Sequence, residues 1–177
     1  MTIDFRSDNT LGGSPEIAEA LARANAGRLT SYGGDEITAR MRRRCAEVFE
    51  TEVEVYPVLS GTAGNALAIA CTTPPFGAVF CHDEAHIHLE EFGAVEFFSG
   101  GAKLMPIRGE HGKLSASSLT DAVAEARRNR VGIPSCVSVT NATEAGTVYS
   151  IDELHAICDA ARGAGLRVHM GLSLIHI

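Results

Sequence analysis

The chain has 177 residues, of which 45% are hydrophobic and 21% are charged. This length and balance suit one domain with a hydrophobic core and exclude an intrinsically disordered chain. The formal net charge of −7 argues against nucleic acid or an anionic membrane as a partner, because both attract clustered positive charge.

Nothing in the sequence resembles a signal peptide, and no apolar stretch reaches the ~18 residues of a membrane span. The chain has five cysteines, an odd number, and no pair has the CxxC spacing. We therefore expect free thiols and a cytoplasmic protein.

The hydrophobic pattern predicts helices and strands in alternation. Ser14 and Pro15 suit the start of a first helix, and the sequence from Ser150 to Glu153 is a capping box that opens the last one. In chain order we expect helices at 14–25 and 35–50, a strand at 54–58, a helix at 62–71, strands at 78–81 and 103–106, a helix at 115–128, a strand at 136–139, a helix from 150 to about 162 and a strand at 166–170.

This alternation predicts the fold class: a three-layer α/β architecture with a mainly parallel sheet flanked by helices. In such sheets, ligands bind at the carboxyl ends of the strands. The segments that follow the predicted strands are therefore the first candidates for a functional site.

The segment Ser60-Gly61-Thr62-Ala63-Gly64-Asn65 follows a predicted strand and opens a helix. Free amides in the first helical turn, the helix dipole and the Thr62 hydroxyl favour an anion. The segment is neither a Walker loop nor a GxGxxG motif. An ordinary strand-to-helix turn explains the local sequence equally well.

Three histidines, His82, His86 and His88, follow the strand predicted at 78–81. They could bind a metal ion together with a carboxylate. One ring could instead stack on a planar cofactor, and a polar loop with unrelated histidines is the third interpretation. The segments 6–10 and 140–147 are also polar, but turn residues explain them as well.

Taken together, five segments in order resemble the threonine aldolase branch of the fold-type-I enzymes that use pyridoxal 5'-phosphate (PLP). They are Phe5-Arg6-Ser7-Asp8-Asn9, Tyr32-Gly33 with Asp35, Ser60 to Asn65, Ala85-His86 with Glu91, and Ala142-Thr143-Glu144-Ala145-Gly146-Thr147-Val148-Tyr149. The last form is most similar to the low-specificity and phenylserine-type aldolases.

The resemblance implies a PLP-dependent lyase that cleaves β-hydroxy-α-amino acids to glycine and an aldehyde. It implies that Ser60, Gly61 and Thr62 bind the cofactor phosphate. His86 would stack on the cofactor ring and help to handle the proton of the substrate's hydroxyl group.

The same resemblance places three more residues near the substrate. Ser7 would contact the substrate carboxylate, and Tyr32 and Glu91 would lie close to it. A small-molecule amino acid would be the partner, without nucleic acid or membrane. Because the family's sites form between subunits, the resemblance also implies a homo-oligomer for the full-length protein.

The chain departs from the family pattern near its end. The cofactor-binding lysine of the family is expected on a later strand, whereas the chain has only Lys103 and Lys113. The family's His-x-Asp-Gly-x-Arg pattern stops after His169. We therefore expect residues 1–171 to be the N-terminal portion of a PLP-binding large domain, inactive alone.

The final residues, Leu172 to Ile177, match the translation of a transposase adapter used in DNA library preparation. We expect this tail to be non-native, although a natural apolar tail is the alternative. Two other functions also stay open: a metal-dependent hydrolase built on the three histidines, and a non-catalytic α/β ligand-binding module.

Overall fold

The computed structural model describes residues 12–172. The chain forms two compact units, Met1–Pro57 and Val58–Ile177. The predictions on Ser7 and on residues 173–177 fall outside the described residues. The division into a cofactor-domain portion, 1–171, and a non-native tail stays a prediction.

The first unit contains two helices, α1 (Pro15–Ala24) and α2 (Glu36–Phe49). Both begin where the sequence predicts, because Ser14 and Asp35 accept hydrogen bonds from amides of the first turn. The strand predicted at 54–58 is wrong, since this segment has no regular secondary structure and pairs with no strand of the sheet. The prediction used only the residues of the segment itself, whereas a strand exists only where a neighbouring strand pairs with it.

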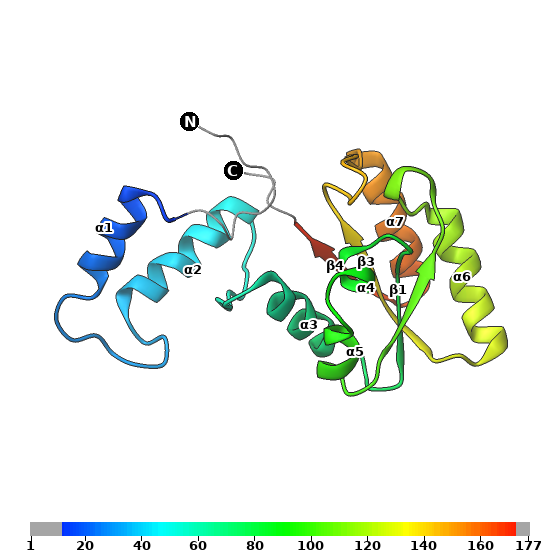
Figure 1. Cartoon of the computed structure of the whole chain (residues 1–177), viewed down its shortest axis with the longest axis horizontal. Helices are drawn as coiled ribbons and strands as arrows, with labels where there is room; N and C mark the ends of the chain where they lie inside the picture. Colours follow the sequence, from blue (N-terminus) through cyan, green and yellow to red (C-terminus); the bar gives the residue numbers. More distant parts are fainter. Residues whose placement is uncertain (1–11, 173–177) are drawn as a thin grey trace. The chain divides into compact units, whose positions relative to one another are not determined.

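The second unit is built on a four-stranded sheet (Figure 1). The strands are β1 (Gly77–His82), β2 (Lys103–Ile107), β3 (Ile133–Thr140) and β4 (Arg167–Gly171). They lie in the order β2-β1-β3-β4, and every pair is parallel. All residues of β1 are buried, as expected for a central strand covered on both faces.

Helices cover both faces of this sheet, which confirms the predicted three-layer α/β fold (Figure 1). The helices α6 (Ala116–Asn129) and α7 (Ile151–Gly163) pack on one face. The helices α3 (Gly61–Thr72) and α5 (Ala94–Phe98) pack on the other.

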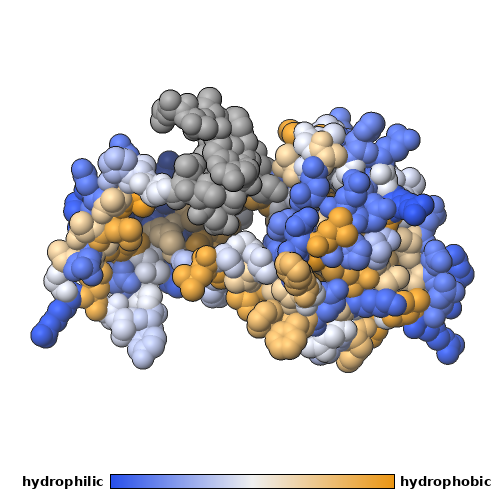
Figure 2. Space-filling model, in the orientation of Figure 1, coloured by the Kyte–Doolittle hydropathy of each residue, from blue (hydrophilic) through white to orange (hydrophobic). Residues whose placement is uncertain are grey.

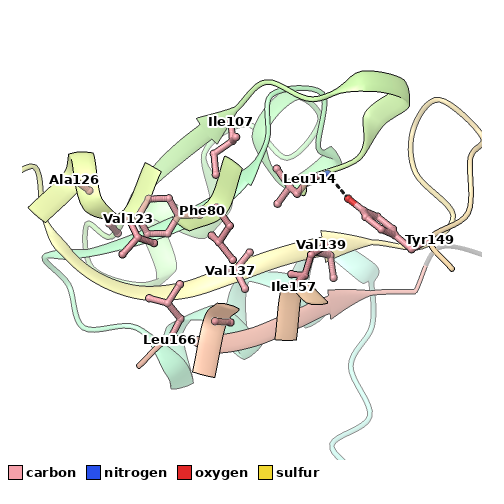
Figure 3. Close-up of a cluster of buried hydrophobic side chains, with 13 residues drawn as sticks. Phe80, Ile107, Leu114, Val123, Ala126, Val137, Val139, Tyr149, Ile157 and Leu166 are labelled. Carbon is pink, nitrogen blue, oxygen red and sulfur yellow. Dashed lines mark hydrogen bonds between the residues drawn. The ribbon is translucent and has the colours of Figure 1, made fainter. Parts of the chain in front are cut away.

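The larger hydrophobic core lies between the sheet and the helices α6 and α7 (Figure 3). Phe80, Val137 and Val139 enter this core, while their neighbours Val79, Cys81 and Cys136 belong to the core under α3. This alternation is the period of two that a β-strand imposes on its side chains. It confirms the strands predicted at 78–81 and 136–139.

Local signals set the ends of the longer helices. Ser150 and Glu153 form the predicted capping box of α7, and Ser115 caps α6. Two short helices, α4 (His86–Leu89) and α5, were not predicted because each has fewer than two turns. None of the helices within residues 12–172 has the length and apolar character that crossing a membrane requires.

Candidate active site

The first component of the site is the N-terminus of α3. Ser60 has extended backbone angles, and its side chain accepts a hydrogen bond from the Ala63 amide at 3.2 Å. The Ser60 carbonyl accepts the next one, from Gly64. The amides of Gly61 and Thr62 are thus the ones that the helix itself does not satisfy, and a Cβ built on Gly61 meets open space. This terminus suits an anion.

The second component lies beyond the carboxyl end of β1. His86 is the first residue of α4, and its side chain is 47% exposed. Glu91 follows α4, and its carboxylate is fully buried. Asn65 in α3 donates a hydrogen bond to Glu91 Oε1 at 2.7 Å. This bond joins the first turns of α3 to the end of β1 that carries His86.

The His86 ring lies between two carboxylates. Its Nε2 is 3.9 Å from Glu91 Oε1, and its Nδ1 is 3.7 Å from Glu144 Oε1. Both distances are too long for hydrogen bonds but within ion-pair range. Glu144 follows β3, so the arrangement draws on the carboxyl ends of two neighbouring strands, as the fold class predicts.

His82 has a structural role instead. Its side chain is almost fully buried, and the Glu84 amide donates to Nδ1 at 3.0 Å. Because Nδ1 accepts, Nε2 carries the proton and donates to the Gly109 carbonyl oxygen at 3.1 Å. Neither nitrogen is free for a metal ion.

The metal interpretation of His82, His86 and His88 is therefore wrong. Among residues 12–172, no cluster of three or more ligating side chains suits a metal ion. The histidines are close in sequence, but the end of β1 and the start of α4 turn the chain between His82 and His86.

The predicted cofactor- and substrate-binding residues do not all lie together. Ser60, Gly61 and Thr62 share the terminus of α3, and His86 and Glu91 lie together. Tyr32 belongs to the first unit, where it is fully exposed with a left-handed backbone (φ 59°). Ser7 falls outside the described residues.

Neither lysine lies at this site. Lys103 begins β2, at the amino end of the strand, and the Lys113 ammonium pairs with Glu153 Oε2 at 2.9 Å. That the family's cofactor-binding lysine lies on a later strand stays a prediction.

Asn65 and Glu144 lie within motifs that the sequence shows, but no role was predicted for either side chain. The signal for Asn65 was a single amide in an otherwise apolar helix sequence. Glu144 carried no local signal, because its partner His86 is remote in sequence.

Buried groups near the sheet have shifted ionisation. Burial lowers the pKa of His169, whose Nδ1 lies 2.8 Å from the Ser138 hydroxyl. Burial also raises the pKa of the Cys81 thiol to about 12. These two groups stay neutral near pH 7.

The fold and site together define a class: a three-layer α/β protein with an open helix N-terminus and a histidine at the carboxyl edge of a parallel sheet. Residues 4–171 match the beta-eliminating lyase family, and the chain belongs to this family.

Relatives of known name support the same assignment. The low-specificity L-threonine aldolase of Pseudomonas aeruginosa is 41% identical over 169 residues, which cover 96% of this chain and 49% of that protein. The enzyme of the same name from a Pseudomonas species is 40% identical and covers 94% and 48%. The chain thus spans about half the length of the curated relatives it matches.

Solved structures agree with this fold. A Leishmania major threonine aldolase superposes with a TM-score of 0.84 and 30% identity, covering 91% of this chain and 47% of that chain. An archaeal alanine:glyoxylate aminotransferase has a TM-score of 0.65 at 16% identity, covering 88% and 40%, and shows the fold alone.

Proposed function

We propose that the full-length protein is a PLP-dependent lyase that cleaves L-threonine-type β-hydroxy-α-amino acids to glycine and an aldehyde. The observation that carries this proposal is the joining of the α3 terminus to His86 through Asn65 and Glu91. Membership of the beta-eliminating lyases and the names of the two Pseudomonas relatives support the reaction class.

The residues present fit a phosphate-bearing cofactor. Gly61 and Thr62 offer unsatisfied amides, the Thr62 hydroxyl adds a donor, and Ser60 holds the turn that exposes them. The open space at Gly61 lets a ligand approach the backbone closely. When bound, PLP supplies a conjugated ring that accepts the electron pair left by cleavage of the Cα–Cβ bond.

The chain's own residues would bind the cofactor, orient the His86 ring and transfer the hydroxyl proton. His86 is partly exposed and would cover one face of the cofactor ring. Glu91, buried and held by Asn65, lies on the Nε2 side of the imidazole. Because the buried Glu91 occupies the Nε2 side of the ring, Nδ1 is the nitrogen that would take the hydroxyl proton.

The test is to measure glycine and aldehyde release from L-threonine by the full-length protein with PLP. We expect both products in equal amounts, and their loss in the Thr62→Val and His86→Asn variants. PLP binding without product release would support the alternative of a non-catalytic ligand-binding module.

A cytoplasmic location and a homo-oligomer are also parts of this proposal. The free cysteines support the location. Exposed aromatic residues support the assembly, since Phe97 and Phe98 stay largely uncovered and Figure 2 shows apolar surface over α5. Sedimentation of the full-length protein would test the assembly.

A further inference from the structure

We propose that Glu144 is a further catalytic residue, which takes the proton of the substrate's β-hydroxyl group onward from His86 to solvent. This inference rests on the proposed lyase function and assigns a role to a side chain on the loop after β3. It arises from the position of the Glu144 carboxylate, which faces the nitrogen of His86 that Glu91 leaves free.

The loop holds Glu144 in place through bonds of its own. The Thr143 amide donates to the Thr147 carbonyl oxygen at 2.9 Å, and the Gly146 amide donates to the Thr143 carbonyl oxygen at 2.8 Å. The two threonine hydroxyls lie 2.8 Å apart. Glu144 is thus presented by a closed turn whose hydrogen bonds do not involve its own side chain.

A neighbouring turn anchors this loop to the rest of the unit. The Thr147 hydroxyl donates to the His111 carbonyl oxygen at 2.6 Å. Gly112, with φ of +75°, lies so close to Thr143 that a Cβ would come within 2.9 Å of its hydroxyl oxygen. His82 contacts the same turn at Gly109. Buried His82 thus helps to fix the turn at 109–112, which in turn holds the loop that carries Glu144.

The spacing at His86 suits a hydroxyl group. Nδ1 and Glu144 Oε1 are 3.7 Å apart. An oxygen atom at a normal hydrogen-bond distance of about 2.8 Å from both would sit at the apex of a triangle with these two atoms. On the other side of the ring, Glu91 is 3.9 Å from Nε2 and has no solvent access. The two carboxylates therefore differ in role.

Exposure distinguishes the two roles. The Glu91 side chain is fully buried and held by Asn65, so it orients the ring. The Glu144 side chain is 40% exposed, so it can exchange a proton with water. When Nδ1 takes a proton, the charged ring lies between two carboxylates, which stabilise it electrostatically.

The O–H bond of the substrate breaks, and its electron pair forms the carbonyl bond of the aldehyde while the Cα–Cβ bond breaks. The electron pair of that bond stays with Cα, which later takes a proton from solvent to give glycine. The hydroxyl proton moves to His86 Nδ1. After the aldehyde has left, it passes through one water molecule in the place of the hydroxyl oxygen to Glu144 Oε1, and then to solvent.

The experiment compares Glu144→Gln, Glu144→Asp and the control Glu110→Gln in the full-length protein with PLP. Glu110 is an exposed carboxylate on the neighbouring turn, and only its backbone contributes a hydrogen bond there. We expect Glu144→Gln to lower kcat about 100-fold, the lower end of a general acid–base contribution, with KM nearly unchanged. Glu144→Asp should restore part of kcat, and Glu110→Gln should match the parent protein.

A second measurement does not depend on activity. In protein labelled with 15N-histidine, the signals of His86 are identified by their loss in His86→Asn. We expect Glu144→Gln to shift the Nδ1 resonance more than the Nε2 resonance, and Glu110→Gln to shift neither. If the Nδ1 resonance of His86 does not shift in Glu144→Gln, the role of Glu144 is overturned, even if the lyase function holds. A shifted Nδ1 in a protein that releases no aldehyde would support the contact and refute the lyase function instead.

Discussion

The hydrogen bond between Asn65 and Glu91 should contribute more to stability than the exposed bond between Asn129 and Glu125 in α6. Replacing Asn65 with alanine removes the donor of the 2.7 Å bond to Glu91 Oε1. The other carboxylate oxygen, Oε2, is buried and has no hydrogen-bond partner among the described residues. Asn65→Ala would therefore leave both oxygens of a buried carboxylate unsatisfied.

The expected change in the free energy of unfolding follows from the charge on the acceptor. A hydrogen bond to a charged group contributes about 1.5–3 kcal/mol, and a neutral one about 0.5–1.5 kcal/mol. We expect Asn65→Ala to lower the free energy of unfolding by about 2 kcal/mol, and by about 1 kcal/mol in a Glu91→Gln background. Urea unfolding followed by circular dichroism measures all four corners of this double-mutant cycle.

The chain offers a matched control in α6. Asn129 Nδ2 donates to Glu125 Oε1 at 3.5 Å, which is the same pair of groups on an exposed face. We expect Asn129→Ala to change the free energy of unfolding by less than about 0.5 kcal/mol. Equal effects of Asn65→Ala in the Glu91 and Glu91→Gln backgrounds would refute the charge-assisted bond.

Three further predictions concern stability and reactivity. Ser150→Ala should cost about 1 kcal/mol of unfolding free energy by removing the cap that accepts from the Glu153 amide, and no loss in urea unfolding would contradict the capping box. Burial lowers the pKa of His169, so the unfolded chain binds its proton more readily. The free energy of unfolding should therefore fall as pH drops from about 6.5 through the lowered pKa, and less so in His169→Gln, as urea titrations at several pH values would test. Iodoacetamide should label exposed Cys71 in the folded protein but Cys81, whose pKa is about 12, only in urea. Mass spectrometry would decide this, and equal native labelling of both thiols would be inconsistent with the burial of Cys81.

Local signals predicted most of the second unit. The Ser14 cap and the capping box at Ser150 place the starts of two helices to within a residue or two, because a cap is satisfied by amides of its own first turn. The buried run at 77–82 is recognisable as a central strand because both of its faces are apolar. The segment at 54–58 also contains apolar residues, yet it forms no strand, since pairing depends on a distant partner.

The site was less predictable than the fold for the same reason. The open N-terminus of α3 can be recognised in a short segment, because its free amides belong to consecutive residues. The pairing of His86 with Glu144 depends on how β1 and β3 lie side by side in the sheet. No local pattern contains that adjacency, so only the topology brings these two side chains together.

The placement of the two lysines limits what the described residues can do. Lys103 begins β2 at the amino edge of the sheet, and Lys113 pairs with Glu153, so neither amine lies among the groups around His86. In the proposed reaction, the described residues would provide the phosphate-binding helix terminus and the side chains that transfer the proton, but neither of these two lysines would supply the amine for covalent attachment. If the proposal is correct, the amine is supplied by residues of the full-length protein other than these two lysines. Lys103→Arg and Lys113→Arg should then leave turnover by the full-length protein unchanged, and loss of covalent PLP attachment in either variant would refute this assignment.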